Sequence, residues 1–345
     1  MKKIIIRTAI ILMSIVITFV LLEAGIRAFY KFRFRPKGTA HIPAPMTYRV
    51  SKNKDLVFEL IPDSKALVKG IPYIINSWGF RDKKYRERKA HEKRIIFVGD
   101  SLTYGWLVPL SETYHKQLET LMTEKGYSID VFGMGVVGYN TVQEYHIIKE
   151  YIHRFHPDMV ILQICPNDFE RRLSIKKKPD EKGFVLTPYY DFSIPYVLKK
   201  TKTAEFLMKY SHLFRFINLK MSWLKKKGNE NYNPEDIFLL GEEEAFSYLK
   251  KTKKYLDSMN IPLSVVIFPF RKVGENYIYA SIHEKIHNHL DHMQVPYLDL
   301  YEEFDLTNRD NNIWIDRLHL NASGYGIAAE RLYGFLTPQL YNSVR

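Results

Sequence analysis

The sequence predicts an α/β fold built on a parallel, doubly wound sheet. Five short apolar runs rich in β-branched residues have the length and composition of strands buried on both faces of a sheet. They cover residues 94–99, 129–132, 159–164, 263–268 and 295–300. Strands that alternate with helices favour a parallel sheet with helices packed on it, and longer amphipathic segments separate several of these runs.

Four helices are expected from the spacing of apolar residues. They cover residues 112–125, 242–259, 277–292 and 321–336. In the first, Tyr114, Leu118 and Met122 recur four residues apart, which places them on one helix face. In the last, Ala328 and Leu332 share a face in the same way. The first helix follows the 94–99 strand, so strand, turn and helix come in succession there.

Two short motifs supply the parts of a serine nucleophile. Gly99-Asp100-Ser101 ends the first strand, and Asp316-Arg317-Leu318-His319 comes more than two hundred residues later. A serine hydroxyl needs an imidazole to accept its proton and a carboxylate to hold that imidazole in the right tautomer. Ser101 would lie at the carboxyl end of its strand, where open α/β sheets bind ligands. We predict Ser101 as nucleophile, His319 as base and Asp316 as the residue that orients the base. The alternative is a Gly-Asp-Ser turn that only ends a strand.

Donors for an oxyanion are expected from the next two loops. Acyl transfer creates an oxyanion, which is stabilised by N–H groups already aimed at it. Gly138, in the glycine-rich loop 133–138, could supply a backbone N–H because glycine lets the backbone approach a ligand closely. Asn167 follows the 159–164 strand and could supply its side-chain amide, beside the backbone N–H of Ser101. The alternatives are a plain turn glycine and a helix-capping asparagine.

Together these segments resemble the SGNH (GDSL-type) hydrolase superfamily. Four blocks carry the resemblance in the family's order over about residues 94–337: Gly99-Asp100-Ser101-Leu102, Gly135-x-x-Gly138, Asn167-Asp168, and Asp316-Arg317-Leu318-His319 with Leu320-Asn321-Ala322-Ser323-Gly324. The resemblance implies a three-layer α/β/α domain of flavodoxin-like type with a five-stranded parallel sheet, and a serine esterase activity without a cofactor. The segment Asn76–Asp82 is also similar to membrane-anchored bacterial members that handle cell-surface glycans.

One position departs from the family pattern. Cys165 stands where the family usually has glycine, two residues before Asn167, so the local backbone there is expected to differ. Cys165 is also a rival nucleophile, but a thiol directly after an apolar strand is expected to be buried and inert.

Composition limits the other functions. The single cysteine excludes an intrachain disulfide, and the net charge of +13 comes without a nucleic-acid recognition motif. His283, His287 and His289 lie close together, and the first two share a helix face. We interpret them as a solvated helix face and expect neither a metal nor a cofactor.

The N-terminus predicts a membrane anchor. Residues 4–22 are almost wholly apolar apart from Arg7, and about 20 such residues span a bilayer. A cleaved signal peptide is the alternative, but Leu22-Glu23-Ala24-Gly25 is a poor cleavage site. Basic residues flank both ends, so the positive-inside rule does not decide the orientation. The position of the anchor and the family resemblance place the catalytic domain outside the cytoplasm.

The chain is expected to divide into an anchor (1–34), a proline-containing extended stalk that packs on the domain (35–92) and a hydrolase domain (93–340). Residues 170–236 would be an insertion in that domain, with helices near 194–210 and 212–226. Because the insertion leaves the sheet at a carboxyl edge, it is placed to cover the active site. Residues 171–228 carry 15 basic and 4 acidic residues, which suits anionic lipid or an acidic glycan but equally an ordinary solvated surface.

These observations predict a membrane-anchored serine esterase that hydrolyses acyl esters, most simply O-acetyl esters, on a cell-surface carbohydrate. An O-acyltransferase that passes the acyl group to a polysaccharide would use the same residues. A lipid esterase or thioesterase would need a long apolar channel, which the Phe-rich insertion could supply. A non-enzymatic glycan-binding or assembly module is the remaining alternative.

Overall fold

A computed structural model describes residues 2–33, 40–42, 47–169, 173–180, 183–188, 211, 213–214, 217, 241–272, 277, 279–306 and 313–341. The chain divides into two compact units. One contains residues 1–40 and 187–236, and the other contains residues 41–186 and 237–345. Every residue predicted to take part in catalysis belongs to the second unit.

A five-stranded sheet forms the centre of the second unit. Its strands are β6 (Lys93–Gly99), β7 (Ile129–Gly135), β8 (Met159–Ile164), β11 (Leu263–Ile267) and β12 (Tyr297–Asp299). They lie in the order β12-β11-β8-β6-β7, and all neighbouring pairs are parallel. Phe97 at the centre pairs with Gly133 on one side and Ile161 on the other. The predicted α/β class and five-stranded parallel sheet are therefore confirmed.

Two strands differ in length from the prediction. β7 continues through Gly133 to Gly135, because those residues pair with the end of β6 despite their low strand propensity. β12 is limited to Tyr297–Asp299. Pro296 has no N–H to donate and contributes only its carbonyl, which accepts the amide of Val265 at 2.9 Å.

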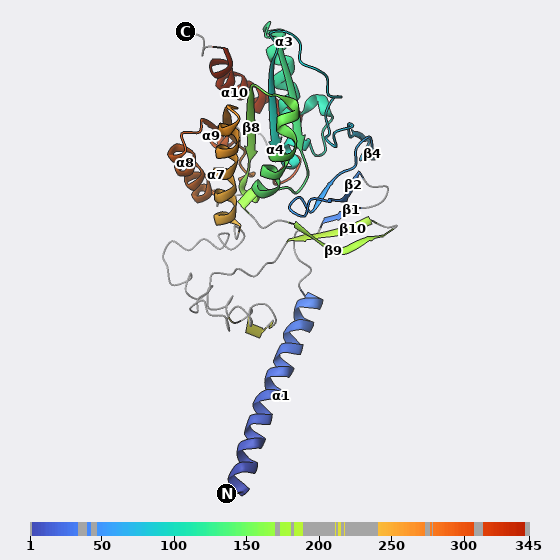
Figure 1. The fold of residues 1–345 in the computed structure, drawn as a ribbon, viewed down its shortest axis with the longest axis vertical. Coiled ribbons are helices and arrows are strands. Elements are labelled where there is room, and N and C mark those ends of the chain that lie inside the picture. Colours follow the sequence, from blue (N-terminus) through green and yellow to red (C-terminus); the bar gives the residue numbers. More distant parts are fainter. Residues whose placement is uncertain are drawn as a thin grey trace. The chain divides into compact units, whose positions relative to one another are not determined.

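Helices cover both faces of this sheet (Figure 1). α3 (Tyr114–Glu124) packs against α10 (Ala322–Tyr341), and α4 (Thr141–Phe155) packs against α7 (Glu242–Ser258). The chain moves outward from β6 to β7 and back across the sheet to β8, so right-handed crossovers place α3 and α4 on opposite faces. α4 was not expected. The side chain of Asn140 caps its first turn by accepting the amide of Val142.

Three further helices and two 3₁₀ turns are described in this unit. They are α2 (Ser101–Tyr104), α8 (Ala280–His292) and α9 (Tyr301–Leu306), with 3₁₀ turns η1 (Leu110–Glu112) and η2 (Pro166–Phe169). α2 begins two residues after the last residue of β6, and η2 begins two residues after the last residue of β8. They therefore carry Ser101 and Asn167 to the same edge of the sheet.

Two antiparallel hairpins precede the sheet. They are β2 (Tyr48–Val50) with β3 (Phe58–Leu60), and β4 (Lys65–Val68) with β5 (Ile71–Ile74). The first packs on the domain through Phe58, whose ring lies 5.2 Å from that of Tyr139. The second does so through Tyr73, whose ring stacks on Tyr104 at 5.3 Å. These contacts give the segment before β6 a direct link to α2.

The described part of the insertion contains β9 (Leu173–Asp180) and β10 (Gly183–Pro188). Together with β1 (Ala40–Ile42) they form a three-stranded sheet in the order β1-β10-β9. The helices expected near residues 194–210 and 212–226 lie outside the described residues, apart from isolated positions.

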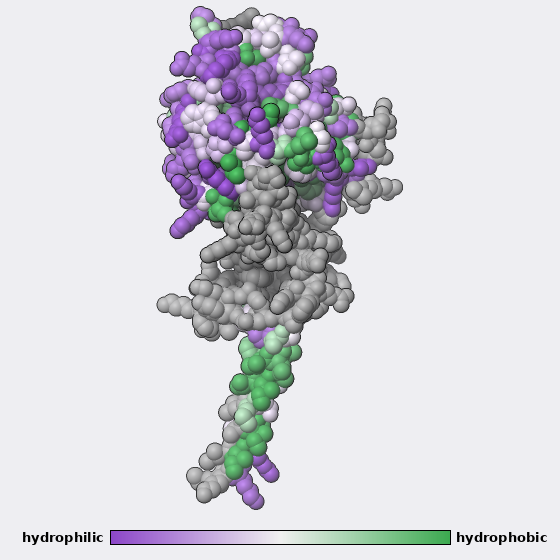
Figure 2. All heavy atoms as spheres, turned by 90° about the vertical axis from the view of Figure 1, so that its right-hand side faces the viewer, coloured by the Kyte–Doolittle hydropathy of each residue, from purple (hydrophilic) through white to green (hydrophobic). Residues whose placement is uncertain are grey.

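The first unit contains α1 (Lys2–Arg33), and Figure 2 shows apolar side chains over much of its visible face. The carboxylate of Glu23 accepts hydrogen bonds from the Ser211 hydroxyl at 2.8 Å and the Leu213 amide at 2.9 Å. Among the described residues, no helix has both the length and the apolar character needed to cross a membrane. The spanning helix expected over residues 4–22 is thus not supported in this part of the chain.

Candidate active site

Ser101, His319 and Asp316 form a continuous hydrogen-bonded chain. His319 Nε2 lies 2.9 Å from Ser101 Oγ, and His319 Nδ1 lies 2.8 Å from Asp316 Oδ2. Ser101 is almost completely buried at 3% exposure. The structure thus brings together the three residues that the motifs selected from opposite ends of the domain. This arrangement can pass the hydroxyl proton of Ser101 to His319.

The loop that carries His319 is held by its own backbone and by Asp316. The amide of Ile315 donates to the carbonyl of His319 at 2.8 Å, which closes the loop. Asp316 Oδ1 accepts the amides of Leu318 and His319, each at 2.8 Å. Burial alone would raise the pKa of Asp316, but the amide and ring of His319 hold that pKa below its usual range. Asp316 therefore stays a carboxylate that only accepts hydrogen bonds.

The turn that presents Ser101 is built by Asp100 and Gln163. Asp100 is fully buried, and its Oδ1 caps α2 by accepting the amide of Leu102 at 2.9 Å. Gln163, on β8, accepts the amide of Asp100 at 3.1 Å and the Thr103 hydroxyl at 2.9 Å through its Oε1. The position of Ser101 is thus fixed from both sides of the turn.

The glycine block approaches this turn closely. A Cβ on Gly135 would collide with the backbone of Tyr104 in α2, so only glycine lets β7 and α2 pack at this distance. Gly138 has a φ of 79°, in the left-handed region that favours glycine. Its N–H has no hydrogen-bond acceptor among the described residues. The N–H of Ser101, in the first turn of α2, likewise has no hydrogen-bond acceptor among the described residues.

Asn167 lies in η2 and points its amide at Asp100. Asn167 Nδ2 donates to Asp100 Oδ2 at 2.9 Å, and Asn167 Oδ1 accepts the thiol of Cys165. A carboxylate can only accept, so it must face the NH₂ end of the asparagine. This contact occupies one of the two N–H groups on Nδ2. The other has no acceptor among the described residues.

Cys165 is unsuited to nucleophilic attack. It is completely buried, and its sulfur lies 3.5 Å from Asp100 Oδ2. Burial and the nearby Asp100 and Asp168 carboxylates raise the pKa of the Cys165 thiol well above its usual value. The thiol therefore stays protonated and serves as a donor that orients Asn167.

A cavity of about 510 Å³ lies beside the His319 loop. One wall comes from Ile315 and Asn321, which flank that loop, and another from Leu107 and Val108, which follow α2. Lys69 from the second hairpin adds a positive charge. The lining is mixed, with apolar side chains next to groups that form hydrogen bonds.

Several residues that shape the site were not among the predicted ones. Asp100 could have been found, because an aspartate directly before a short helix is a typical N-cap. Gln163 and Arg81 carry no comparable signal. Arg81 donates to the carbonyls of Tyr104 and Val108 at 2.9 and 2.8 Å, across more than twenty residues of sequence.

The histidines of α8 differ from their interpretation as a solvated face. His283 is only 4% exposed, and its Nδ1 lies 2.7 Å from Asp299 Oδ2 at the end of β12. That interpretation is wrong for His283. It overlooked Asp299 because the acidic partner comes from a strand rather than from the same helix.

No protein-family model matches the chain, and no curated protein matches it. Solved structures with a similar arrangement include an acetyl xylan esterase, AlAXEase, at 16% identity and a TM-score of 0.41, covering 70% of this chain and 98% of that one. A family 3 carbohydrate esterase from Clostridium thermocellum has 19% identity and a TM-score of 0.40, covering 73% and 98%. A lipase/acylhydrolase from Enterococcus faecalis has 12% identity and a TM-score of 0.44, covering 72% and 96%.

Proposed function

We propose that this protein is a serine esterase that hydrolyses acyl esters through an acyl-enzyme. The hydrogen-bonded chain from Ser101 through His319 to Asp316 carries the proposal. It places a buried hydroxyl, an imidazole and a carboxylate in the order that nucleophilic catalysis needs.

The first half-reaction forms the acyl-enzyme. Ser101 Oγ attacks the carbonyl carbon of the ester while His319 Nε2 takes the hydroxyl proton. The C=O electrons move onto oxygen, where the Ser101 and Gly138 N–H groups and the free N–H of Asn167 stabilise the negative charge. The carbonyl then re-forms, the C–O bond to the leaving alcohol breaks, and protonated His319 gives its proton to that alcohol oxygen.

The second half-reaction returns the enzyme to its starting state. His319 takes a proton from water, whose oxygen attacks the acyl carbon, and the same donors hold the second oxyanion. Collapse breaks the bond to Ser101 Oγ, which recovers a proton from His319, and the acid leaves. Asp316 keeps its charge throughout and stabilises the imidazolium.

The substrate we propose is an O-acylated carbohydrate. The cavity beside the His319 loop combines Ile315 and Leu107 with Glu112, Asn321 and Ser323. Sugar hydroxyls need hydrogen-bonding partners of this kind, whereas a long fatty-acyl chain needs a continuous apolar wall. Most of the lining is apolar, and a short acyl group such as acetyl would contact these apolar side chains beside the polar groups; the apolar residues are Ile71, Leu107, Val108, Ile315 and Ala322.

The test is acyl release from a panel of acetylated sugars and fatty-acyl esters. We expect release from the acetylated sugars, its loss in Ser101→Ala, and no change in Ser111→Ala, which removes an exposed serine hydroxyl. Adding a free sugar acceptor distinguishes transfer from hydrolysis, because a transferase would yield the acylated acceptor in place of the free acid. Equal activity of the parent and Ser101→Ala would contradict the esterase proposal.

We also propose that residues 4–22 attach the chain to a membrane, with the domain outside the cytoplasm. The apolar sequence supports this, together with Ile10, Val16 and Leu21 of α1, which are 54%, 60% and 66% exposed. Exposed apolar side chains in such number call for an apolar environment. The full-length chain should sediment with membranes, while a chain that begins near Pro36 should not. Protease treatment of intact cells would show the side.

A further inference from the structure

Two histidines and an aspartate converge where α8 passes the end of β12. His283 and His287 lie one turn apart on α8, and Asp299 is the last residue of β12. His283 Nδ1 and His287 Nε2 are each 2.7 Å from the same oxygen, Asp299 Oδ2. The three donor atoms lie within 4.8 Å of one another.

We propose that these three residues bind a zinc ion. Two imidazoles and one carboxylate are a typical zinc donor set, with water as the fourth ligand. Bonds of about 2.0–2.2 Å at tetrahedral angles place ligand atoms about 3.3 Å apart. Each imidazole nitrogen would then move by roughly half an ångström from Asp299 Oδ2, and the two nitrogens, which lie within 4.8 Å of each other, would also come to that spacing.

The groups around the three ligands already point them inward. Tyr277 Oη lies 3.0 Å from His283 Nε2, so this nitrogen can carry the proton while Nδ1 faces the ion. The amide of Tyr301 donates to Asp299 Oδ1 at 2.8 Å, which leaves Oδ2 for the ion. Binding partners behind the ligands are typical of metal sites, because they fix the ring orientation and the histidine tautomer.

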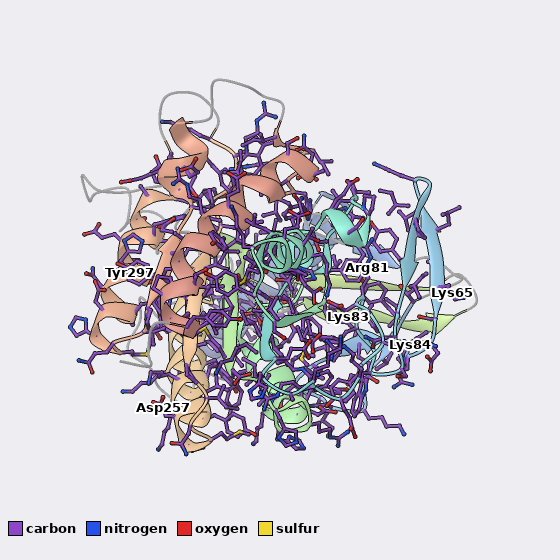
Figure 3. The ribbon with its side chains drawn as sticks, turned by 90° about the horizontal axis from the view of Figure 1, so that it is seen from above. Lys65, Arg81, Lys83, Lys84, Asp257 and Tyr297 are labelled. Carbon is purple, nitrogen blue, oxygen red and sulfur yellow. The ribbon has the colours of Figure 1, made fainter. Side chains whose placement is uncertain are left out.

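The site is closed on one side and open on the other. The His283 side chain is 5% exposed, whereas that of His287 is 35% exposed. An ion can therefore enter past His287, whose ring stacks on Tyr297 at 4.8 Å. Figure 3 shows Tyr297 on the opposite side of the domain from Arg81 and Lys83. The proposal does not depend on the reaction at Ser101.

Bound zinc would connect α8 to the last strand of the sheet. His283 reaches further through Tyr277, whose hydroxyl accepts the amide of Phe270 at 3.1 Å. The next amide, that of Arg271, donates to the carbonyl of Arg317 in the His319 loop at 2.9 Å. The ion would thus stabilise an element that supports this loop.

The experiment uses the untagged full-length chain, stripped with a chelator and titrated with zinc chloride by calorimetry. Cobalt(II) serves as a spectroscopic probe in parallel. We expect one tight equivalent of zinc and a tetrahedral cobalt spectrum. His287→Ala and Asp299→Asn should each weaken zinc binding by at least about 100-fold. His287 is partly exposed, so its removal should leave the fold intact.

His292→Ala is the matched control. His292 lies on the same helix and is exposed, and its Nδ1 donates to the backbone carbonyl of Asn288 one turn earlier. The His292→Ala variant should bind zinc with the same affinity as the parent protein. Zinc binding that is equal in the parent and in His287→Ala would overturn the proposal, and so would an octahedral cobalt spectrum. Equal binding would leave the cluster as a carboxylate that accepts hydrogen bonds from two imidazoles.

Discussion

Asp316 uses its two carboxylate oxygens for different tasks. Oδ1 accepts the amides of Leu318 and His319 and shapes the loop, while Oδ2 accepts the Nδ1 proton of His319. The side chain is 46% exposed, so water can approach it. Its task is therefore to select the tautomer of His319 rather than to stabilise the fold by charge.

Asp316→Asn separates these two tasks. Asparagine keeps an oxygen for the two backbone amides, but it presents an N–H to His319 Nδ1 and so favours the wrong tautomer. We expect turnover to fall by about 10²–10⁴-fold, with little change in KM or in the unfolding transition. Steady-state kinetics and urea denaturation measure both. An unchanged turnover would show that Asp316 does not orient the base.

The role of Asn167 is in question because Cys165, two residues earlier, stands where the family usually has glycine. Its side chain donates to Asp100, the residue before Ser101, and accepts the thiol of Cys165. Asn167→Ala should lower turnover by on the order of a hundredfold to a thousandfold, about 3 kcal/mol, with little change in KM. Full activity of Asn167→Ala would show that the Asn167 side chain does not stabilise the oxyanion.

Cys165→Gly tests whether the thiol does more than orient Asn167. A thiol is a weak donor, and the stronger contact from Asn167 to Asp100 would remain. We expect activity within about tenfold of the parent, since only one weak hydrogen bond is lost. A folded Cys165→Gly variant without activity would instead indicate a direct role for the sulfur.

Among the secondary-structure elements, the short helix α2 depends most on distant contacts. It has only four residues, Ser101–Tyr104, too few to be stable alone. Asp100 caps its start. Arg81 binds the carbonyls at its end, donating to Tyr104 at 2.9 Å and Gly105 at 2.6 Å, and its guanidinium lies 4.1 Å above the Tyr73 ring. The second hairpin thus supports the element that carries the nucleophile.

Arg81→Lys should destabilise this element. A lysine ammonium cannot reach the carbonyls of Tyr104, Gly105 and Val108 from one position or stack on Tyr73 as a guanidinium does. We expect unfolding to require about 2–3 kcal/mol less free energy. Arg88→Lys is the control, because Arg88 forms an exposed pair with Asp158 and its replacement should cost less than about 1 kcal/mol. Equal losses in urea denaturation would contradict the assignment.

The strands could be predicted from the sequence alone, whereas several contacts between distant elements could not. The five strands were predictable because short apolar runs rich in β-branched residues, such as Met159–Ile164, are typical of strands buried on both faces of a sheet. The proximity of Ser101 to His319 was expected because Ser101 directly follows a predicted strand and Asp316-x-x-His319 precedes a predicted helix. Arg81 and the pair of His283 with Asp299 were not, because each contact depends on which elements become neighbours. Local sequence does not encode that.

For the whole molecule, buried charge determines how stability varies with pH. Burial alone would raise the pKa of Asp82, but Lys116 and His115 lower it to about 2. The stability that this carboxylate contributes is present above its unfolded pKa, near 3.8, and is lost as the pH falls toward 2. Protonation of Asp82 therefore lowers the stability of the fold only under strongly acidic conditions.

Glu144 has the opposite effect. It is fully buried on α4, and both of its carboxylate oxygens have no hydrogen-bond partner among the described residues. Burial, joined by the charges of Asp168 and Asp100, raises the pKa of Glu144 well above its usual value. The folded protein therefore keeps a proton that the unfolded chain releases above pH 4.5. Stability is complete below that pH and declines as the pH rises toward the folded pKa.

Glu144→Gln should remove this decline. Glutamine has nearly the same shape and no proton to lose, so the variant should gain stability over the parent by about 1.4 kcal/mol per pH unit above the unfolded pKa. Urea denaturation between pH 5 and 7 should show this difference growing as the pH rises. Glu150→Gln is the control, because it makes the same chemical change at an exposed position on the same helix. A difference for Glu144→Gln that stays constant from pH 5 to 7 would mean that Glu144 is ionised in the folded protein.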